Sequence, residues 1–218
     1  MLLPVLRAAA LAAAFSLASL VASAQTFGEF LTDKRLPVTF LGADYSAARY
    51  YGDPLTLNAE RMKEEFTRIN ELLVHEASKY DIAGALRREV PVEYTINVAE
   101  AANKQADYSS LIVPSDVAHR PAFTNQTVAD MVGRYVLPAD SDGMGLVFIV
   151  EDINKNTEQE TFWVAFINLR TKQVQYARRM TGQAMGFGFR NHWAYPLNSG
   201  IKTIEGHYAQ WKKEATKG

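Results

Sequence analysis

Three successive stretches in the second half of the chain constrain its fold most strongly. The first two are rich in β-branched and aromatic side chains, the composition that favours β-strands, and the third includes Val174 and Tyr176. They cover residues 146–153, 162–169 and 174–180. The two connections between them are short and polar, as hairpin loops usually are. We therefore predict an antiparallel meander of three strands in the C-terminal half.

Two other stretches carry the spacing of an amphipathic helix. Apolar side chains recur every three or four residues from Asn58 to about Arg87, and again from Trp193 to Trp211. This spacing predicts one long helix near the N-terminus and a second that closes the chain. Gly84 is expected to mark the end of the first helix. Pro196 is expected in the first turn of the second, where its missing N–H matters least.

Shorter elements are predicted between these landmarks. Residues 37–42 and 90–98 favour strands, residues 111–113 favour a brief strand, and residues 99–106 and 127–136 favour helices. The order of elements indicates helices packed on a mixed sheet. The predicted fold is therefore an α/β sandwich of two or three layers, formed by a single domain.

Residues 1–24 have the pattern of a secretory signal peptide. Arg7 precedes an apolar run, and Ala22-Ser23-Ala24 supplies the small side chains of a cleavage site. We expect cleavage after Ala24, which leaves residues 25–218 as one globular α/β domain without a transmembrane segment. The signal predicts export, with the bacterial periplasm as the favoured destination and the extracellular medium as the alternative.

The composition argues against several classes of function. The formal net charge is −1, and removal of Arg7 with the signal makes it one unit more negative. This balance favours neither a nucleic acid nor a membrane surface as partner. The chain has no cysteine, which excludes a disulfide framework and a cysteine nucleophile.

One passage of the predicted meander resembles known envelope proteins. Residues 162–174 read FWVAFINLRTKQV, and a strand and a glycine-containing turn into the last helix follow. This passage is similar to envelope proteins related to the amino-terminal domain of TolB and to the curli secretion channel, which show an Asp-x-x-Thr-Gly-x-Val hairpin here. Thr171 and Val174 match that hairpin, whereas Asn168 and Lys172 replace its Asp and Gly. The resemblance implies an envelope assembly or interaction role without catalysis, and it transfers no site residues.

Two short motifs imitate metal sites but lack essential ligands. The sequence from His75 to Lys79 begins like a zinc-protease motif, yet Lys79 stands where the second histidine is needed. Residues 140–143 resemble part of a calcium loop, but Pro138 and Ile149 occupy its first and last ligand positions. We expect no metal and no cofactor.

The segment from Gly182 to Trp193 concentrates the candidate site. It runs from a predicted strand into a predicted helix and lacks one glycine of the dinucleotide-binding fingerprint. Free backbone N–H groups at the helix start, beside a basic side chain, would bind a small anion. The candidate binding residues are Gly186, Gly188, Arg190, Asn191, His192 and Trp193. The competing structural interpretation is that the glycines permit a tight turn while Phe187, Phe189 and Trp193 fill the core.

These observations leave three functions open. The leading prediction is a non-catalytic interaction or assembly module of the cell envelope, whose protein partner contacts a sheet edge or the glycine segment. The first alternative is a protein that binds a small anionic ligand or a glycan through residues 186–193. The second is an envelope hydrolase with dispersed acid and base residues, drawn from Asp44, Glu93, Asp107 and His192.

Overall fold

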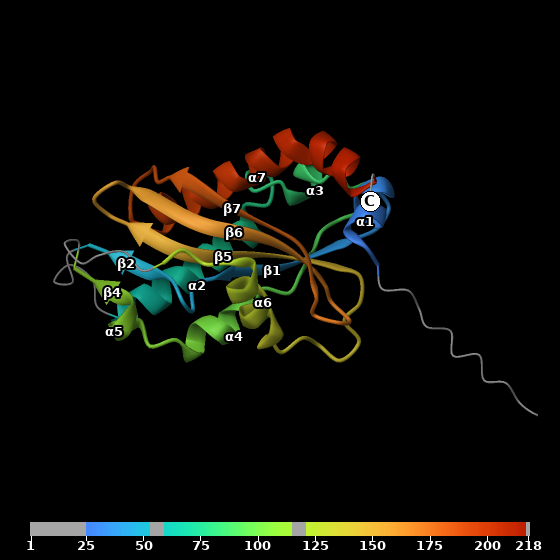
Figure 1. Cartoon of the computed structure of the whole chain (residues 1–218). Helices are drawn as coiled ribbons and strands as arrows, with labels where there is room; N and C mark the ends of the chain where they lie inside the picture. Colours follow the sequence, from blue (N-terminus) through green and yellow to red (C-terminus); the bar gives the residue numbers. More distant parts are fainter. Residues whose placement is uncertain (1–24, 53–58, 115–120, 217–218) are drawn as a thin grey trace, which may run out of the picture.

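The computed structural model of the chain describes residues 25–52, 59–114 and 121–216 (Figure 1). The expected signal peptide lies outside the described residues. The strands are β1 (Val38–Asp44), β2 (Arg49–Tyr51), β3 (Glu93–Tyr94), β4 (Ile112–Val113), β5 (Met144–Asn154), β6 (Gln159–Asn168) and β7 (Val174–Gln183). The helices are α1 (Phe27–Thr32), α2 (Ala59–His75), α3 (Ile82–Ala85), α4 (Asn97–Gln105), α5 (Tyr108–Leu111), α6 (Asn125–Gly133) and α7 (Phe189–Ala215).

The strands form one mixed sheet around β5. β5 pairs with β6, and β6 with β7, in antiparallel fashion, in the three segments where the sequence predicts strands. The other edge of β5 is shared by two parallel neighbours, because β1 pairs with its first half and β2 with its last residues. β3 adds to β1, and β4 adds to β2, both parallel. The architecture is therefore a mixed α/β sheet.

Helices cover both faces of this sheet (Figure 1). On β6, alternate side chains point to opposite faces. Phe162, Val164 and Phe166 join the apolar cluster that includes α2 and α7, whereas Trp163, Ala165 and Ile167 join the cluster that includes α6. Burial on both faces explains why these strands read as nearly continuous apolar runs. Within the described part of the chain, no helix has the length and apolar character needed to cross a membrane.

The C-terminal helix α7 lies very close to the sheet at two glycines. A Cβ atom on Gly182 of β7 would lie 2.8 Å from Pro196 Cα, and one on Gly200 would lie 2.7 Å from the ring of Phe162. These contacts leave no room for side chains at the two positions. Pro196 lies beyond the first turn of α7, so its predicted place in the first turn is wrong. Its ring packs against the glycine of the sheet.

A buried arginine joins three distant segments at the other end of α7. Arg88 Nη1 donates to the carbonyl oxygens of Phe30 (2.8 Å) and Asp33 (2.9 Å), and its Nη2 donates to the hydroxyl of Tyr208 on α7 (3.0 Å). The Tyr208 hydroxyl in turn donates to the carbonyl oxygen of Leu31 (2.7 Å). Because hydrogen bonds that involve a charged group are strong, this network fixes α1 against α7.

The structure corrects two predicted boundaries. The long first helix ends at His75, not near Arg87, because the Asp81 carboxylate accepts from Gly84 N (2.8 Å) and caps the separate short helix α3. The predicted strand at residues 90–98 is reduced to Glu93–Tyr94, since α4 begins at Asn97. Local helix capping by Asp81 therefore overrides apolar periodicity at the first of these places.

Glu160 is an unusual residue in this core. Its side chain is 0% exposed, and within the described residues neither carboxylate oxygen has a hydrogen-bond partner. It lies on β6 opposite Ile153 and Gly182. Burial raises the pKa of the Glu160 carboxyl well above its ordinary value of 4.5, so the folded protein retains a proton that the unfolded chain releases.

This acid predicts a pH-dependent loss of stability. The contribution of Glu160 to the free energy of unfolding is favourable below the pKa that its carboxyl has in the unfolded chain, about 4.5. It is lost as the pH rises from there towards the pKa in the folded protein, since only the native state keeps the proton. We expect Glu160→Met to raise the free energy of unfolding by roughly 1–3 kcal/mol at pH 8, because it removes a buried polar group without a partner. Urea unfolding at pH 5 and pH 8 measures this. An equal gain at both pH values would contradict the assignment.

Candidate functional site

The segment that the sequence singles out forms an exposed loop between β7 and α7. We call residues 184–188 the glycine loop. Its first residue is tied to the turn between β5 and β6, because Ala184 N donates to the Glu158 carbonyl oxygen (2.7 Å). Gly186 and Gly188 have φ angles of 105° and 76°, which L-residues with side chains rarely adopt. The two glycines are therefore required for the path of the loop.

Side chains from the first turn of α7 hold the loop in place. Asn191 Nδ2 donates to the carbonyl oxygen of Phe187 (3.3 Å), and His192 Nδ1 lies 3.3 Å from the carbonyl oxygen of Gly186. The backbone N–H of His192 donates to the carbonyl oxygen of Gly188 (3.0 Å). These bonds satisfy loop carbonyls that have no partner in a strand or helix. Asn191 and His192 therefore shape the loop.

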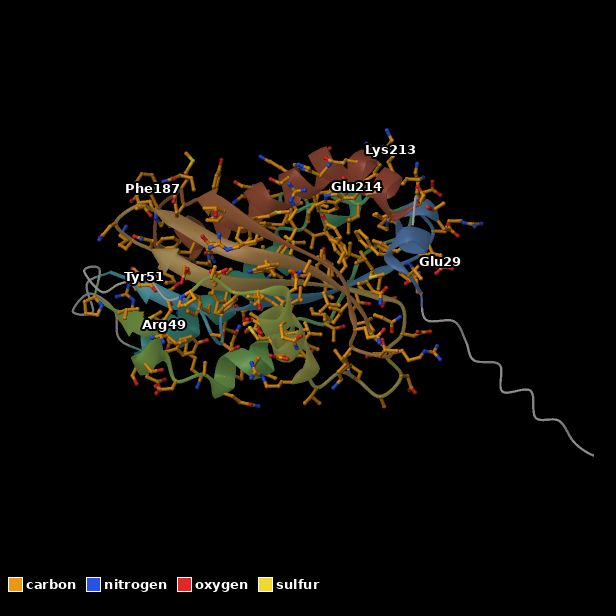
Figure 2. All side chains as sticks on the ribbon, in the orientation of Figure 1. Glu29, Arg49, Tyr51, Phe187, Lys213 and Glu214 are labelled. Carbon is orange, nitrogen blue, oxygen red and sulfur yellow. The ribbon has the colours of Figure 1, made fainter. Side chains whose placement is uncertain are left out.

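The loop presents two apolar side chains to solvent. Phe187 is 97% exposed and Met185 is 52% exposed. Figure 2 shows Phe187 at the end of the molecule opposite Glu29, on the same side as Tyr51 and Arg49. The interpretation that Phe187 fills the core is therefore wrong. A residue between two glycines at the tip of a strand-to-helix connection points away from the sheet.

The next two aromatic residues anchor the base of the loop. Phe189 is half-buried and packs against Phe66 of α2, with ring centroids 5.8 Å apart. Trp193 is buried and meets Tyr50 edge to face at 6.3 Å. Aromatic contacts of this kind stabilise beyond their buried area. Phe189 and Trp193 therefore pack into the core, as the structural interpretation expects, whereas Phe187 does not.

A cleft of about 440 Å³ lies beneath the glycine loop. Its apolar side is formed by Tyr50, Phe187, Phe189 and Trp193. Charged groups come from Arg61 of α2 and from Lys155 and Glu158 of the β5–β6 turn, with Lys155 Nζ 3.5 Å from Glu158 Oε1. Four of the six candidate residues from the sequence also line it, namely Gly186, Gly188, His192 and Trp193. The cleft is thus part aromatic and part charged.

The other two candidates, Arg190 and Asn191, lie on the exposed side of α7 and are not among the residues that line the cleft. The Arg190 guanidinium donates through Nε and Nη2 to Asn191 Oδ1, at 3.2 Å each. The start of α7 does have free backbone donors, because no side chain caps it and its first turn contains no acid. Among the described residues, the one carboxylate that lines the neighbouring cleft, Glu158, is paired with Lys155.

The dispersed acid and base candidates are not brought together by the contacts that the structure records. Asp44 accepts from the Tyr135 hydroxyl, Glu93 from the Thr39 hydroxyl, and Asp107 from the backbone of Ser109. His192 contacts the glycine loop, far along the chain from these acids. General acid–base catalysis requires two such groups within reach of one substrate, and no recorded contact joins two of these four residues; the acid beside His192 is Glu158, at 4.0 Å. Across residues 25–52, 59–114 and 121–216, no three His, Asp or Glu side chains gather as metal ligands would.

No family model and no curated protein matches the chain. Among solved structures, the C-terminal domain of LpoB from Salmonella enterica aligns over 72% of this chain and 96% of that one, at 12% identity and a TM-score of 0.24. A TM-score this low carries no argument about fold or function.

The geometry predicts that Phe187 and Trp193 differ sharply in their structural importance. Phe187→Ser is expected to change the free energy of unfolding by no more than about 0.5 kcal/mol, because the side chain packs on nothing. Trp193→Ala is expected to cost roughly 3–5 kcal/mol, because it empties a filled core position. Urea unfolding of both variants measures the difference. A loss of more than about 2 kcal/mol in Phe187→Ser would show that the side chain is buried in solution.

Proposed function

We propose that this chain is an exported, non-catalytic interaction module of the bacterial cell envelope. In this proposal residues 1–24 are removed as a signal peptide, and residues 25–218 act as one domain in the periplasm. The glycine loop is the surface that binds a protein partner. The chain uses no metal or cofactor in this role, because recognition needs only a preformed surface.

The exposure of Phe187 is the observation that carries this proposal. A single exposed apolar side chain is common in proteins, but Phe187 is accompanied by Met185 on the same short loop. Two φ angles that favour glycine keep the loop away from the sheet. Aromatic and methionine side chains are enriched at protein interfaces, so the pair is suited to insert into an apolar recess.

The hydrogen bonds of the loop add a second argument. Asn191 and His192 fix the backbone on either side of Phe187. A loop that is already ordered loses less conformational entropy when a partner binds. Fixing an exposed phenylalanine has no benefit for the isolated fold, whereas it favours association. The partner in this proposal presents an apolar pocket for Phe187, bordered by groups that complement Lys155 and Glu158.

The two alternatives have less support. The anion-binding alternative rests on the uncapped start of α7, but Arg190, the cation that it assigns to the site, donates to Asn191 and does not line the neighbouring cleft. The hydrolase alternative is weakened because no recorded contact joins any two of Asp44, Glu93, Asp107 and His192; the acid that faces His192, at 4.0 Å, is Glu158.

Site-specific photocrosslinking in living cells tests the proposal. We would replace Phe187 with benzoylphenylalanine in the full chain, irradiate the cells and analyse the envelope fraction by mass spectrometry. A discrete crosslinked protein is expected, because the side chain at this position enters the partner's recess. In the expected crosslinked product, this protein begins at Gln25, because the signal peptide has been removed.

Val136 provides a matched control position. It is 80% exposed and follows α6, which packs on the other face of the sheet from α7. Benzoylphenylalanine at position 136 is expected to give no crosslink to the same protein. Identical products from both positions, or none from position 187, would reject the glycine loop as the binding surface.

A further inference from the structure

The last strand of the sheet, β7, has one open edge. It pairs with β6 on one side, and within the described part of the chain no strand pairs with it on the other. Its burial agrees with this position, because β5 and β6 are buried along almost their whole length, whereas in β7 only Met180 and Gly182 are. Alternate residues of β7 therefore point their backbone N–H and C=O groups away from the sheet.

The length of this edge distinguishes it from the rest of the sheet. β7 has 10 residues, whereas β3 and β4, which form the opposite boundary, have 2 each. Very short edge strands are one way in which proteins avoid pairing with other chains. β7 contains no proline, and its one irregularity of register lies near its start, between Val174 and Tyr176. Residues 176–183 therefore form a regular edge with which another strand can pair.

Helices cover the two faces of β7 and leave its edge as the accessible part. Tyr176 and Met180 pack in the apolar cluster that includes α7, whereas Val174 and Ala177 pack against the cluster that includes α6. A partner that reaches β7 therefore meets main-chain groups flanked by the side chains of two layers. An extended segment that adds to the sheet as a strand fits this arrangement.

A groove of about 470 Å³ lies beside the first half of β7. It is lined by residues 174–177 and by Asn125, Gln126 and Ala129 of α6. Successive side chains of a strand point to opposite faces of its sheet, so alternate side chains of an added strand face this groove. Its lining combines alanines and a valine with amide groups, which suits a side chain of moderate size such as valine.

The charges of β7 favour an acidic segment. The strand carries Arg178 and Arg179 at its middle and no acid. Arg179 already donates to the Glu151 carboxylate, from Nε (2.9 Å) and from Nη2 (3.1 Å). The guanidinium of Arg178 lies 5.9 Å from the Trp211 ring, and among the described residues no recorded ion pair joins it to a carboxylate. An acid opposite Arg178 on an added strand therefore stabilises the pairing.

The same arginines argue against a second copy of this chain as the added strand. Antiparallel pairing of two β7 strands about their midpoint places Arg178 of one copy opposite Arg179 of the other. Like charges directly opposite each other destabilise a strand pair. The edge is therefore better suited to an acidic segment of another protein.

We propose that the open edge of β7 binds an extended, acidic segment of a partner protein, which adds to the sheet as a further strand. Main-chain hydrogen bonds hold the segment, Arg178 selects its acidic side chain, and the groove beside α6 accepts a neighbouring apolar one. This surface is separate from the glycine loop, because no residue of β7 lines the cleft beneath that loop.

Amide hydrogen exchange of the purified protein, measured by NMR, tests the proposal. The probe is an end-blocked peptide of about eight residues in which glutamate and valine alternate, the length of an ordinary strand. We expect the peptide to slow exchange about tenfold or more at alternate residues of β7, because only the outward N–H groups gain acceptors. No slowing at millimolar peptide, or slowing that does not alternate along β7, would overturn the proposal.

Two control peptides act on the unaltered protein, so their outcome does not depend on how a variant folds. Methyl groups on two neighbouring backbone nitrogens keep every side chain of the probe but remove a donor from both of its edges, and we expect binding to weaken about tenfold or more. Replacing glutamate with lysine is expected to weaken binding by about tenfold, since repulsion by Arg178 replaces attraction. Unchanged binding of the methylated peptide would contradict main-chain pairing.

A charge reversal assigns the selectivity to one residue. Arg178→Glu is expected to invert the preference, so that the lysine peptide binds more tightly than the glutamate peptide. Lys202→Glu makes the same change of net charge at an exposed position on α7, outside β7, and is the matched control. It is expected to keep the preference for glutamate. An equal change of preference in both variants would contradict the role of Arg178.

Discussion

The packing of α7 on β6 and β7 is the contact on which the rest of the structure depends. Gly182 and Gly200 allow the helix to approach the sheet until Pro196 and Phe162 fill the space of a side chain. Tyr208 fixes the far end of the helix to α1 through Arg88 and Leu31. With both ends held, the start of α7 has a defined position, and so does the loop that precedes it. The exposure of Phe187 is a consequence of how the helix is seated.

Glu160 and Asp44 are both fully buried acids, but their surroundings differ. Neither carboxylate oxygen of Glu160 has a hydrogen-bond partner among the described residues, and burial raises the pKa of its carboxyl well above the ordinary value. Asp44 is equally buried, but its two oxygens accept from the Tyr135 hydroxyl and from the backbone N–H of Ser46. These donors stabilise the ionised form of Asp44, whereas Glu160 has none. Burial by itself therefore does not determine the behaviour of a carboxyl group; its hydrogen-bond donors do so as well.

The sequence predicts the elements whose burial is regular. β5 and β6 are recognised because both of their faces are apolar and buried, and α7 because Trp193, Ile204 and Trp211 recur along one stripe. The early end of α2 depends on a single cap by Asp81, which periodicity does not include. In the glycine loop, composition suggested a core aromatic, and only the glycine φ angles show that Phe187 points outward. The hydrogen bond from Tyr135 to Asp44 joins residues 91 positions apart, so no local pattern could indicate it.

Fluorine NMR tests the central claim most directly, namely that α7 holds Phe187 in solvent and ready for a partner. The measurement would use para-fluorophenylalanine placed at position 187 in the purified protein. The account predicts a single narrow resonance at the shift of the free amino acid, with a full solvent isotope effect, that broadens when solubilised envelope proteins are added. A resonance at a buried shift in the isolated protein, or one that the envelope proteins leave unchanged, would contradict the account.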